Sequence, residues 1–169
     1  MSSMHVFEPS FLPYGRVITG IPTADMMSVL AGFPLPEEGM VYSPREDDLH
    51  AQLDFEPWGA ALYADMPYQL GYCAGSNARA DALVRHGGSA YICGDSDFEL
   101  IVRHRWEDTP AHFAVPAHTL VELYGDTLRS APLGRDFRIL VILPFATNTE
   151  YPGGSGVPSR NTWQEELPD

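Results

Sequence analysis

The sequence has 169 residues, enough for one domain with a substantial core but marginal for two. Its formal net charge is -13 at pH 7, so a nucleic acid backbone or an anionic membrane surface would be repelled. All ten basic residues are arginine, and the lack of lysine excludes Schiff-base catalysis and a P-loop lysine. The start lacks a basic segment followed by an apolar run, and no stretch approaches the roughly 18 apolar residues of a membrane span. We therefore expect a cytoplasmic protein.

The first third of the chain predicts one helix between loops. Residues 11–20 indicate a turn that leads into a short strand. Residues 22–34 form the best helical segment, because Thr23 can cap its start and Gly32 can end it. Residues 35–54 indicate a loop with one short strand and one helical turn.

From Trp58 onward the pattern becomes that of β-strands. The segments are short and bounded by Gly, Pro, Asp or Asn. Residues 98–106 alternate between an apolar and a polar face, whereas 137–144 are apolar on both faces and predict a central strand. The expected strands are 67–73, 81–86, 89–94, 97–106, 111–115, 119–124, 127–131 and 136–143.

Regularly spaced strands after one early helix predict an all-β domain, either a small barrel or a sandwich. We expect a single domain in three regions: residues 1–57 at the N-terminus, a core over 58–147 and a tail over 148–169. The tail is rich in loop residues, and Trp163 is expected to dock it. Cys73 and Cys93 are interpreted as reduced, buried thiols.

Five stretches carry a resemblance to a known family. They are "YGRV", "MPYQLGYCAGSN", "VPAHTLVELYGDTLRSAP", "VILPFATNT" and "RNTW". In this order they resemble a bacterial, cupin-like family of unknown function that is distantly akin to ureidoglycolate lyase. The resemblance implies a small cupin-like double-stranded β-barrel with an N-terminal helix.

The same resemblance implies that a metal site has been lost. Family members read Glu-x-His and then Glu in the first motif and His in the second, and these places are Val84, His86, Ala90 and Arg129 here. Only His86 keeps a side chain that can bind a metal, whereas zinc and similar ions need three or four donors. We expect no metal and no cofactor. An unusual ligand set of His86, Glu122 and a distant histidine remains an alternative.

Three residues are the main candidates for chemistry or binding. His86 is either a catalytic base in the barrel or a core histidine. Glu122, a carboxylate in the apolar "LVEL", suits acid–base catalysis or a structural ion pair with Arg129. Arg129 either binds an anionic substrate group or lies on the surface. The dipeptide "GD" at 125–126 predicts a hairpin that sets Glu122 opposite Arg129.

Further candidates are weaker. Tyr124 is expected to act with His86 and Glu122 in catalysis, while Tyr72 and Asn77 are expected to bind substrate. The tyrosines could equally be packing residues, and Asn77 and Asn148 could equally be turn residues. The glycine-rich stretch 153–156 could at most be a lid.

The residues together predict a metal-independent small-molecule enzyme. It would carry out lyase, isomerase or cyclase chemistry by proton transfer on an anionic or carbonyl-bearing substrate. The alternative is a non-catalytic cupin-like protein that binds a ligand. Neither nucleic acid nor membrane is an expected partner, and an edge strand within residues 16–21 predicts a homodimer.

Overall fold

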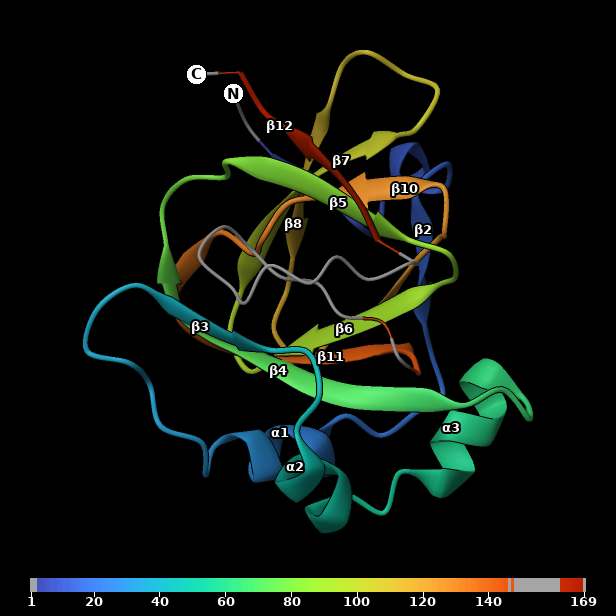
Figure 1. The fold of residues 1–169 in the computed structure, drawn as a ribbon, viewed down its shortest axis with the longest axis vertical. Helices are drawn as coiled ribbons and strands as arrows, with labels where there is room; N and C mark the ends of the chain where they lie inside the picture. The colour runs from blue at the N-terminus through green and yellow to red at the C-terminus, as the bar shows by residue number, and fades with distance from the viewer. Residues whose placement is uncertain (1–2, 146, 148–161, 169) are drawn as a thin grey trace.

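In the computed structural model, residues 3–145, 147 and 162–168 are described. Two six-stranded sheets face each other, and the helices cover the outer side of one of them (Figure 1). This arrangement confirms the expected all-β class. Among the described residues, no helix is long and apolar enough to span a membrane.

The first sheet, called sheet A, has the strand order β1-β8-β7-β10-β5-β12. Its neighbours pair antiparallel except for β1 and β8, which are parallel. The strands of sheet A are β1 (Met4–His5), β5 (Ala82–His86), β7 (Phe98–His104), β8 (Ala111–Val115), β10 (Thr127–Arg129) and β12 (Thr162–Glu166).

The second sheet, called sheet B, has the order β2-β9-β6-β11-β4-β3 and is antiparallel throughout. The strands of sheet B are β2 (Gly15–Ile18), β3 (Met40–Ser43), β4 (Tyr68–Asn77), β6 (Ala90–Gly94), β9 (Leu120–Leu123) and β11 (Gly134–Pro144). Strand β11 lies between β6 and β4, which confirms the prediction of a central strand for 137–144.

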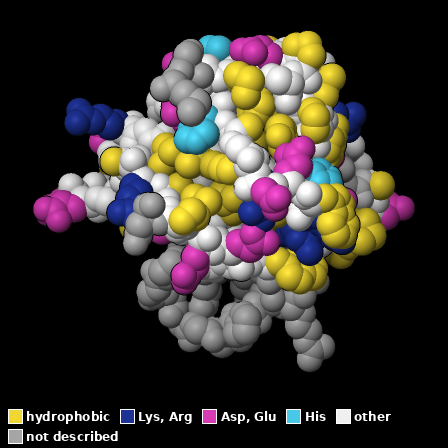
Figure 2. Space-filling view, turned by 90° about the horizontal axis from the view of Figure 1, so that it is seen from above, with side chains coloured by type: hydrophobic (Ala, Val, Ile, Leu, Met, Phe, Trp, Pro, Cys, Tyr) yellow, Lys and Arg dark blue, Asp and Glu magenta, His cyan; other side chains and the backbone are white. Residues whose placement is uncertain are grey.

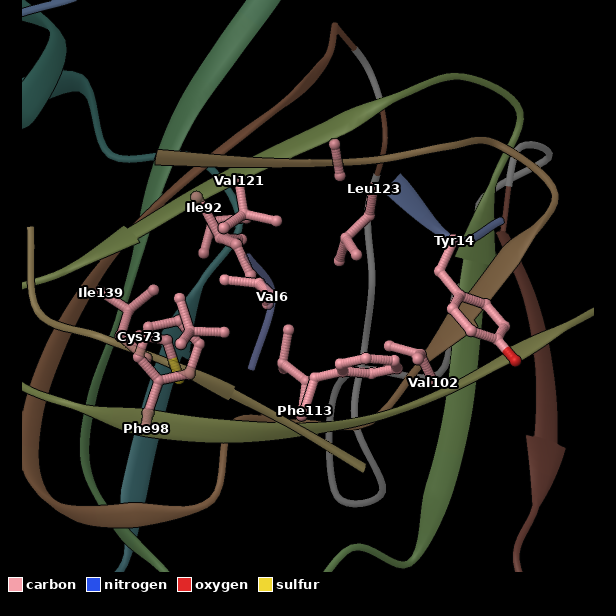
Figure 3. Packing of buried hydrophobic residues seen from close by; sticks show 14 of the residues in the cluster. Val6, Tyr14, Cys73, Ile92, Phe98, Val102, Phe113, Val121, Leu123 and Ile139 are labelled. Atoms are coloured by element: carbon pink, nitrogen blue, oxygen red, sulfur yellow. The ribbon is translucent and has the colours of Figure 1, made fainter. Parts of the chain in front are cut away.

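The main core lies between the two sheets. Strand β7 turns Phe98, Leu100 and Val102 inward, as the alternation in the sequence predicts. Figure 3 shows Phe113 and Val102 of sheet A lying across from Leu123 of sheet B. These side chains fill the interior and hold the sheets together.

A second core lies between sheet B and the helices. The helices are α1 (Ala24–Leu30), α2 (Asp47–Gln52) and α3 (Glu56–Tyr63), and a 3-10 turn, η1 (Pro9–Phe11), precedes β2. The outer face of sheet B is apolar at positions such as Leu140 and Ile142, so it needs a cover. Helix α2 lies at the helical turn expected within residues 35–54. Helix α3 was not predicted, because the pattern from Trp58 onward was interpreted as β-structure, whereas Trp58 lies in α3.

The tail also differs from its prediction. Its described part contains strand β12, which pairs with β5 at the edge of sheet A. Trp163 lies 45% exposed, and the Arg85 guanidinium stacks on its ring at 4.0 Å. Asn148 and the stretch 153–156 lie outside the described residues. Cys73 and Cys93 are both buried and belong to the two different cores.

The surface mixes charge and apolar groups. Figure 2 shows acidic and basic side chains spread over one face, with hydrophobic side chains between them. The large negative charge is therefore not gathered at one point of this face.

Candidate functional site

The segment around Glu122 and Arg129 is not the predicted hairpin. Strand β9 pairs with β2 and β6 in sheet B, whereas β10 pairs with β7 and β5 in sheet A. The turn at 125–126 thus joins the two sheets. The prediction that Glu122 lies opposite Arg129 was wrong, because a two-residue turn sequence does not show whether the chain folds back on itself or crosses to another sheet.

Glu122 and Arg129 point to different sides of their sheets. Val121 and Leu123 belong to the core between the sheets, so Glu122 lies on the outer face of sheet B. Arg129 pairs with Val102 of the same core and therefore faces the interior. The two side chains cannot form the ion pair that the sequence suggested.

Three of the four places implied by the lost metal site lie on one face of the paired strands β5 and β10, and the fourth, Ala90, lies in sheet B. Arg129 lies opposite Val84, His86 follows on the same face of β5, and Ala90 is part of the inner core. His86 is 1% exposed and Arg129 6%. No ion pair or side-chain hydrogen bond among the described residues involves Arg129. In the same part of the chain, no three His, Cys, Asp or Glu side chains gather as a metal group.

The second region of interest is a pocket on the outer side of sheet B. It has a volume of about 790 Å³ and lies between the end of α3, the turn 87–89 and the residues after β11. Its polar lining includes Arg16, Ser89, Tyr91 and Glu122. The largely buried Glu122 carboxylate therefore borders an open pocket.

Two side chains donate to the Glu122 carboxylate, and a third hydroxyl group lies near it. The Nε of Arg16 donates to Oε2 at 2.5 Å, and the Oγ of Ser89 donates to Oε1 at 2.9 Å. The Tyr91 hydroxyl lies 3.4 Å from Oε1 and 3.1 Å from the carbonyl oxygen of Leu62 in α3. Glu122 is 7% exposed, and a buried charge of this kind is stable only when it is paired and hydrogen-bonded.

The position of Arg16 depends on a close approach between two strands. A Cβ atom on Gly15 would lie 1.9 Å from the backbone oxygen of Glu122, so only glycine lets β2 pack this tightly on β9. Arg16 then pairs directly with Glu122 across the two strands. The side chain of Arg16 stays 59% exposed at the rim of the pocket.

Two tyrosines of the pocket have raised pKa values. Burial, followed by the charge of Glu122 and a hydrogen bond to it, raises the pKa of Tyr91 to about 12, although Arg16 opposes this. Burial also raises the pKa of Tyr63, and the positive charge of Arg129 acts in the opposite direction. The Tyr63 hydroxyl lies 2.6 Å from the carbonyl oxygen of Ser89 and 3.2 Å from that of Ile142. Both hydroxyls are therefore neutral hydrogen-bond donors at pH 7.

The remaining predicted residues lie elsewhere. Tyr72 is on the outer face of sheet B, where its ring packs 4.8 Å from that of Phe33. Asn77 donates to the carbonyl oxygen of Pro132 at 3.0 Å, at a separate hollow near the ends of β4 and β11. The backbone amide of Tyr124 donates to the carbonyl oxygen of Tyr14 at 3.0 Å. None of Tyr72, Asn77 and Tyr124 lines the Glu122 pocket.

Sequence reasoning found Glu122 but missed its partners. Arg16 lies in "YGRV", where the glycine before the arginine was the available signal of close strand packing. Ser89 and Tyr91 follow a glycine pair that indicates only a turn. Tyr63 lies in the helix that was not predicted, so no local pattern could link it to the site.

The chain belongs to the family described as Domain of unknown function (DUF4867), whose model matches residues 4–166. No curated protein matches it. Among solved structures, it is similar to the CENP-C cupin domain of Drosophila melanogaster, with 12% identity, a TM-score of 0.41 and coverage of 72% of this chain and 94% of that one. A cupin-like protein of Thermotoga maritima matches with 10% identity, a TM-score of 0.40 and coverage of 67% and 80%. At this level of similarity the matches carry no argument about function.

Proposed function

We propose that the protein is a small-molecule enzyme that moves a proton on an anionic or carbonyl-bearing substrate held in the Glu122 pocket. The reaction would be of the lyase, isomerase or cyclase type, which is also the direction of the resemblance to ureidoglycolate lyase. The observation that supports it best is the buried carboxylate that accepts hydrogen bonds from Arg16 and Ser89 at the edge of an open pocket.

The hydrogen bonds leave room for chemistry at one oxygen of Glu122. An ionised carboxylate has about four acceptor positions. Ser89 and Tyr91 approach Oε1, whereas only Arg16 approaches Oε2. A lone pair on Oε2 can therefore accept a proton from a substrate carbon next to a carbonyl group. The charge that develops on the carbonyl oxygen would be stabilised by the free N–H groups of Arg16.

This assignment changes the roles expected from the sequence. Glu122 keeps its role as the catalytic base, but His86 and Arg129 face the interior and do not line the pocket. Arg16 takes the place that the sequence gave to Arg129. The proposed reaction needs no metal, and elemental analysis of the purified protein tests that expectation.

The second candidate is a ligand-binding protein without catalysis. It is favoured by the buried apolar side chains of Val84 and Ala90, which occupy two of the four places implied for metal ligands. Under this alternative, the pocket binds a ligand but Glu122 moves no proton.

The test is hydrogen–deuterium exchange in D2O, followed by proton NMR on a panel of 2-oxo and 2-hydroxy acids. We expect the wild type to catalyse exchange at the carbon next to the carboxyl or keto group of at least one compound. Glu122→Gln should lower that rate by about 100-fold or more. Asp126→Asn is the matched control, since Asp126 forms an ion pair with Arg105 away from the pocket.

Equal exchange rates for the wild type and Glu122→Gln would contradict the proposal. Binding of a compound without exchange would instead favour the ligand-binding protein.

A further inference from the structure

We infer that the ligand of the Glu122 pocket is a carboxylate with an apolar body, whose anionic group binds the outer edge of Arg16. This inference rests on the pocket of the proposed function but not on any chemistry there. It names the class of ligand and the direction in which the ligand lies.

The geometry of Arg16 leaves its outer edge available. Its Nε is committed to Oε2 of Glu122, which fixes the plane of the guanidinium group. The two terminal nitrogens form no other hydrogen bond among the described residues, and the side chain is 59% exposed. A guanidinium group held in this way presents two parallel N–H groups, which match the two oxygens of a carboxylate.

The charge of the pocket lining does not oppose an anion. Arg16 and Glu122 cancel, and they are the only charged side chains among the described residues that line the pocket. The lining therefore carries no net charge, in a chain whose net charge is -13. The cationic edge of Arg16 can pair with a carboxylate there without a second acidic side chain beside it.

The opposite wall is apolar. Leu62 and Met66 approach from the α3 side, and Pro144 and Phe145 from the end of β11. Met66 is 67% exposed and Phe145 is 48% exposed, so both leave apolar surface that a ligand can cover. The anionic group at Arg16 and the apolar body at Met66 and Phe145 define one orientation.

Thr147 is a second, independent sign of a ligand. It lines the pocket and is fully buried, and its Oγ1 has no hydrogen-bond partner in the described part of the chain. Gln69 donates to the carbonyl oxygen of Thr147 at 2.6 Å and so fixes the residue in place. A buried hydroxyl without a partner is unfavourable, and a polar atom of a ligand in the pocket would satisfy it.

Calorimetric titration with three compounds of the same length tests the inference: hexanoate, hexanamide and hexylammonium. We expect hexanoate to bind at least ten times more tightly than the other two. Arg16→Gln should weaken hexanoate binding by at least ten-fold and leave hexanamide binding unchanged. Arg105→Gln is the matched control, because Arg105 also pairs with a carboxylate but lies outside the pocket.

A second variant, Thr147→Val, separates a binding role from a purely structural one. Valine keeps the shape and removes the hydroxyl that lacks a partner, so the melting temperature of the free protein should rise or stay unchanged. The affinity for a carboxylate that also carries a polar atom, tested as 2-oxohexanoate, should fall by at least three-fold. A lower melting temperature with unchanged affinity would overturn this part.

The outcomes also separate this inference from the proposed function. Equal affinity for hexanoate and hexanamide, or no effect of Arg16→Gln, would overturn the carboxylate inference while Glu122-dependent exchange could still stand. Absence of binding by all three compounds at millimolar concentration would overturn it as well. Tight, Arg16-dependent binding of hexanoate without proton exchange would support it and contradict the catalytic proposal.

Discussion

The Tyr91 hydroxyl lies between helix α3 and the Glu122 carboxylate, and its pKa depends on the surroundings in the pocket. Its neighbours from other elements are Glu122 of β9, Arg16 of β2 and Tyr63 of α3. The folded protein raises the pKa of Tyr91 from 10.0 to about 12, so it favours the neutral hydroxyl. The resulting stabilisation is fully present below pH 10, where both the folded and the unfolded states are protonated, and is lost as the pH rises through 12.

We therefore predict that the free energy of unfolding falls between pH 10 and pH 12 and that Tyr91→Phe reduces this fall. Urea unfolding at pH 9, 10 and 11 measures the slope for both proteins. Tyr63 packs on Tyr91, which helps to raise the pKa of Tyr63, so the difference measures Tyr91 together with its effect on Tyr63. Identical slopes would show that the Tyr91 hydroxyl is not held in the neutral form by its surroundings.

The pairing of strands β9 and β10 determines which charged residues meet. Only three residues separate them, yet β9 belongs to sheet B and β10 to sheet A. Each pairs with strands that are distant in the sequence. Glu122 consequently pairs with Arg16, 106 residues earlier, and not with Arg129.

This pairing predicts the outcome of two double-mutant cycles measured by urea unfolding. The effects of Glu122→Gln and Arg129→Gln on the free energy of unfolding should add to within about 0.5 kcal/mol. Glu122→Gln and Arg16→Gln should show a favourable coupling of roughly 0.2–1 kcal/mol, because Arg16 is exposed and its ion pair is screened by solvent. If the Glu122→Gln, Arg129→Gln double variant were more stable than additive effects allow, the result would contradict this pairing and support the Glu122–Arg129 pair that the sequence suggested.

At the scale of the whole molecule, the edge strands of each sheet pair on one side only within the described residues. Strand β2 is one edge of sheet B, and the described structure pairs it only with β9. An unpaired edge can extend its sheet by pairing with a second copy across a two-fold axis.

We accordingly predict a homodimer that uses residues 16–21, as the sequence suggested. Light scattering at micromolar concentration should give twice the mass of the 18.7 kDa chain. A single-chain mass under these conditions would contradict the prediction. Hydrogen exchange of the β2 amides, compared between dilute and concentrated protein, would locate the contact.

The sequence by itself determined most of the strands and their class. Turn residues at regular intervals marked the starts of β4 to β11, although β4 continues to Asn77 and does not end at residue 73 as expected. Alternation identified the inner face of β7. It also singled out Glu122, because a carboxylate in an apolar strand needs a reason. Helix α2 lies at the helical turn expected within residues 35–54, but α3 was missed, since its sequence is short and weakly patterned and its helical form depends on covering sheet B.

Only the tertiary structure decided on which side of its sheet Glu122 lies. Sheet B is covered on both faces, by sheet A on one side and by helices on the other. In "LVEL", Leu120 packs under the helices while Val121 and Leu123 face the interior. Alternation separates two faces but does not tell which is inner when both are apolar. The partners of Glu122 come from two distant segments, β2 and the start of β6, so the site formed only when long-range pairing brought β2 and β6 to β9.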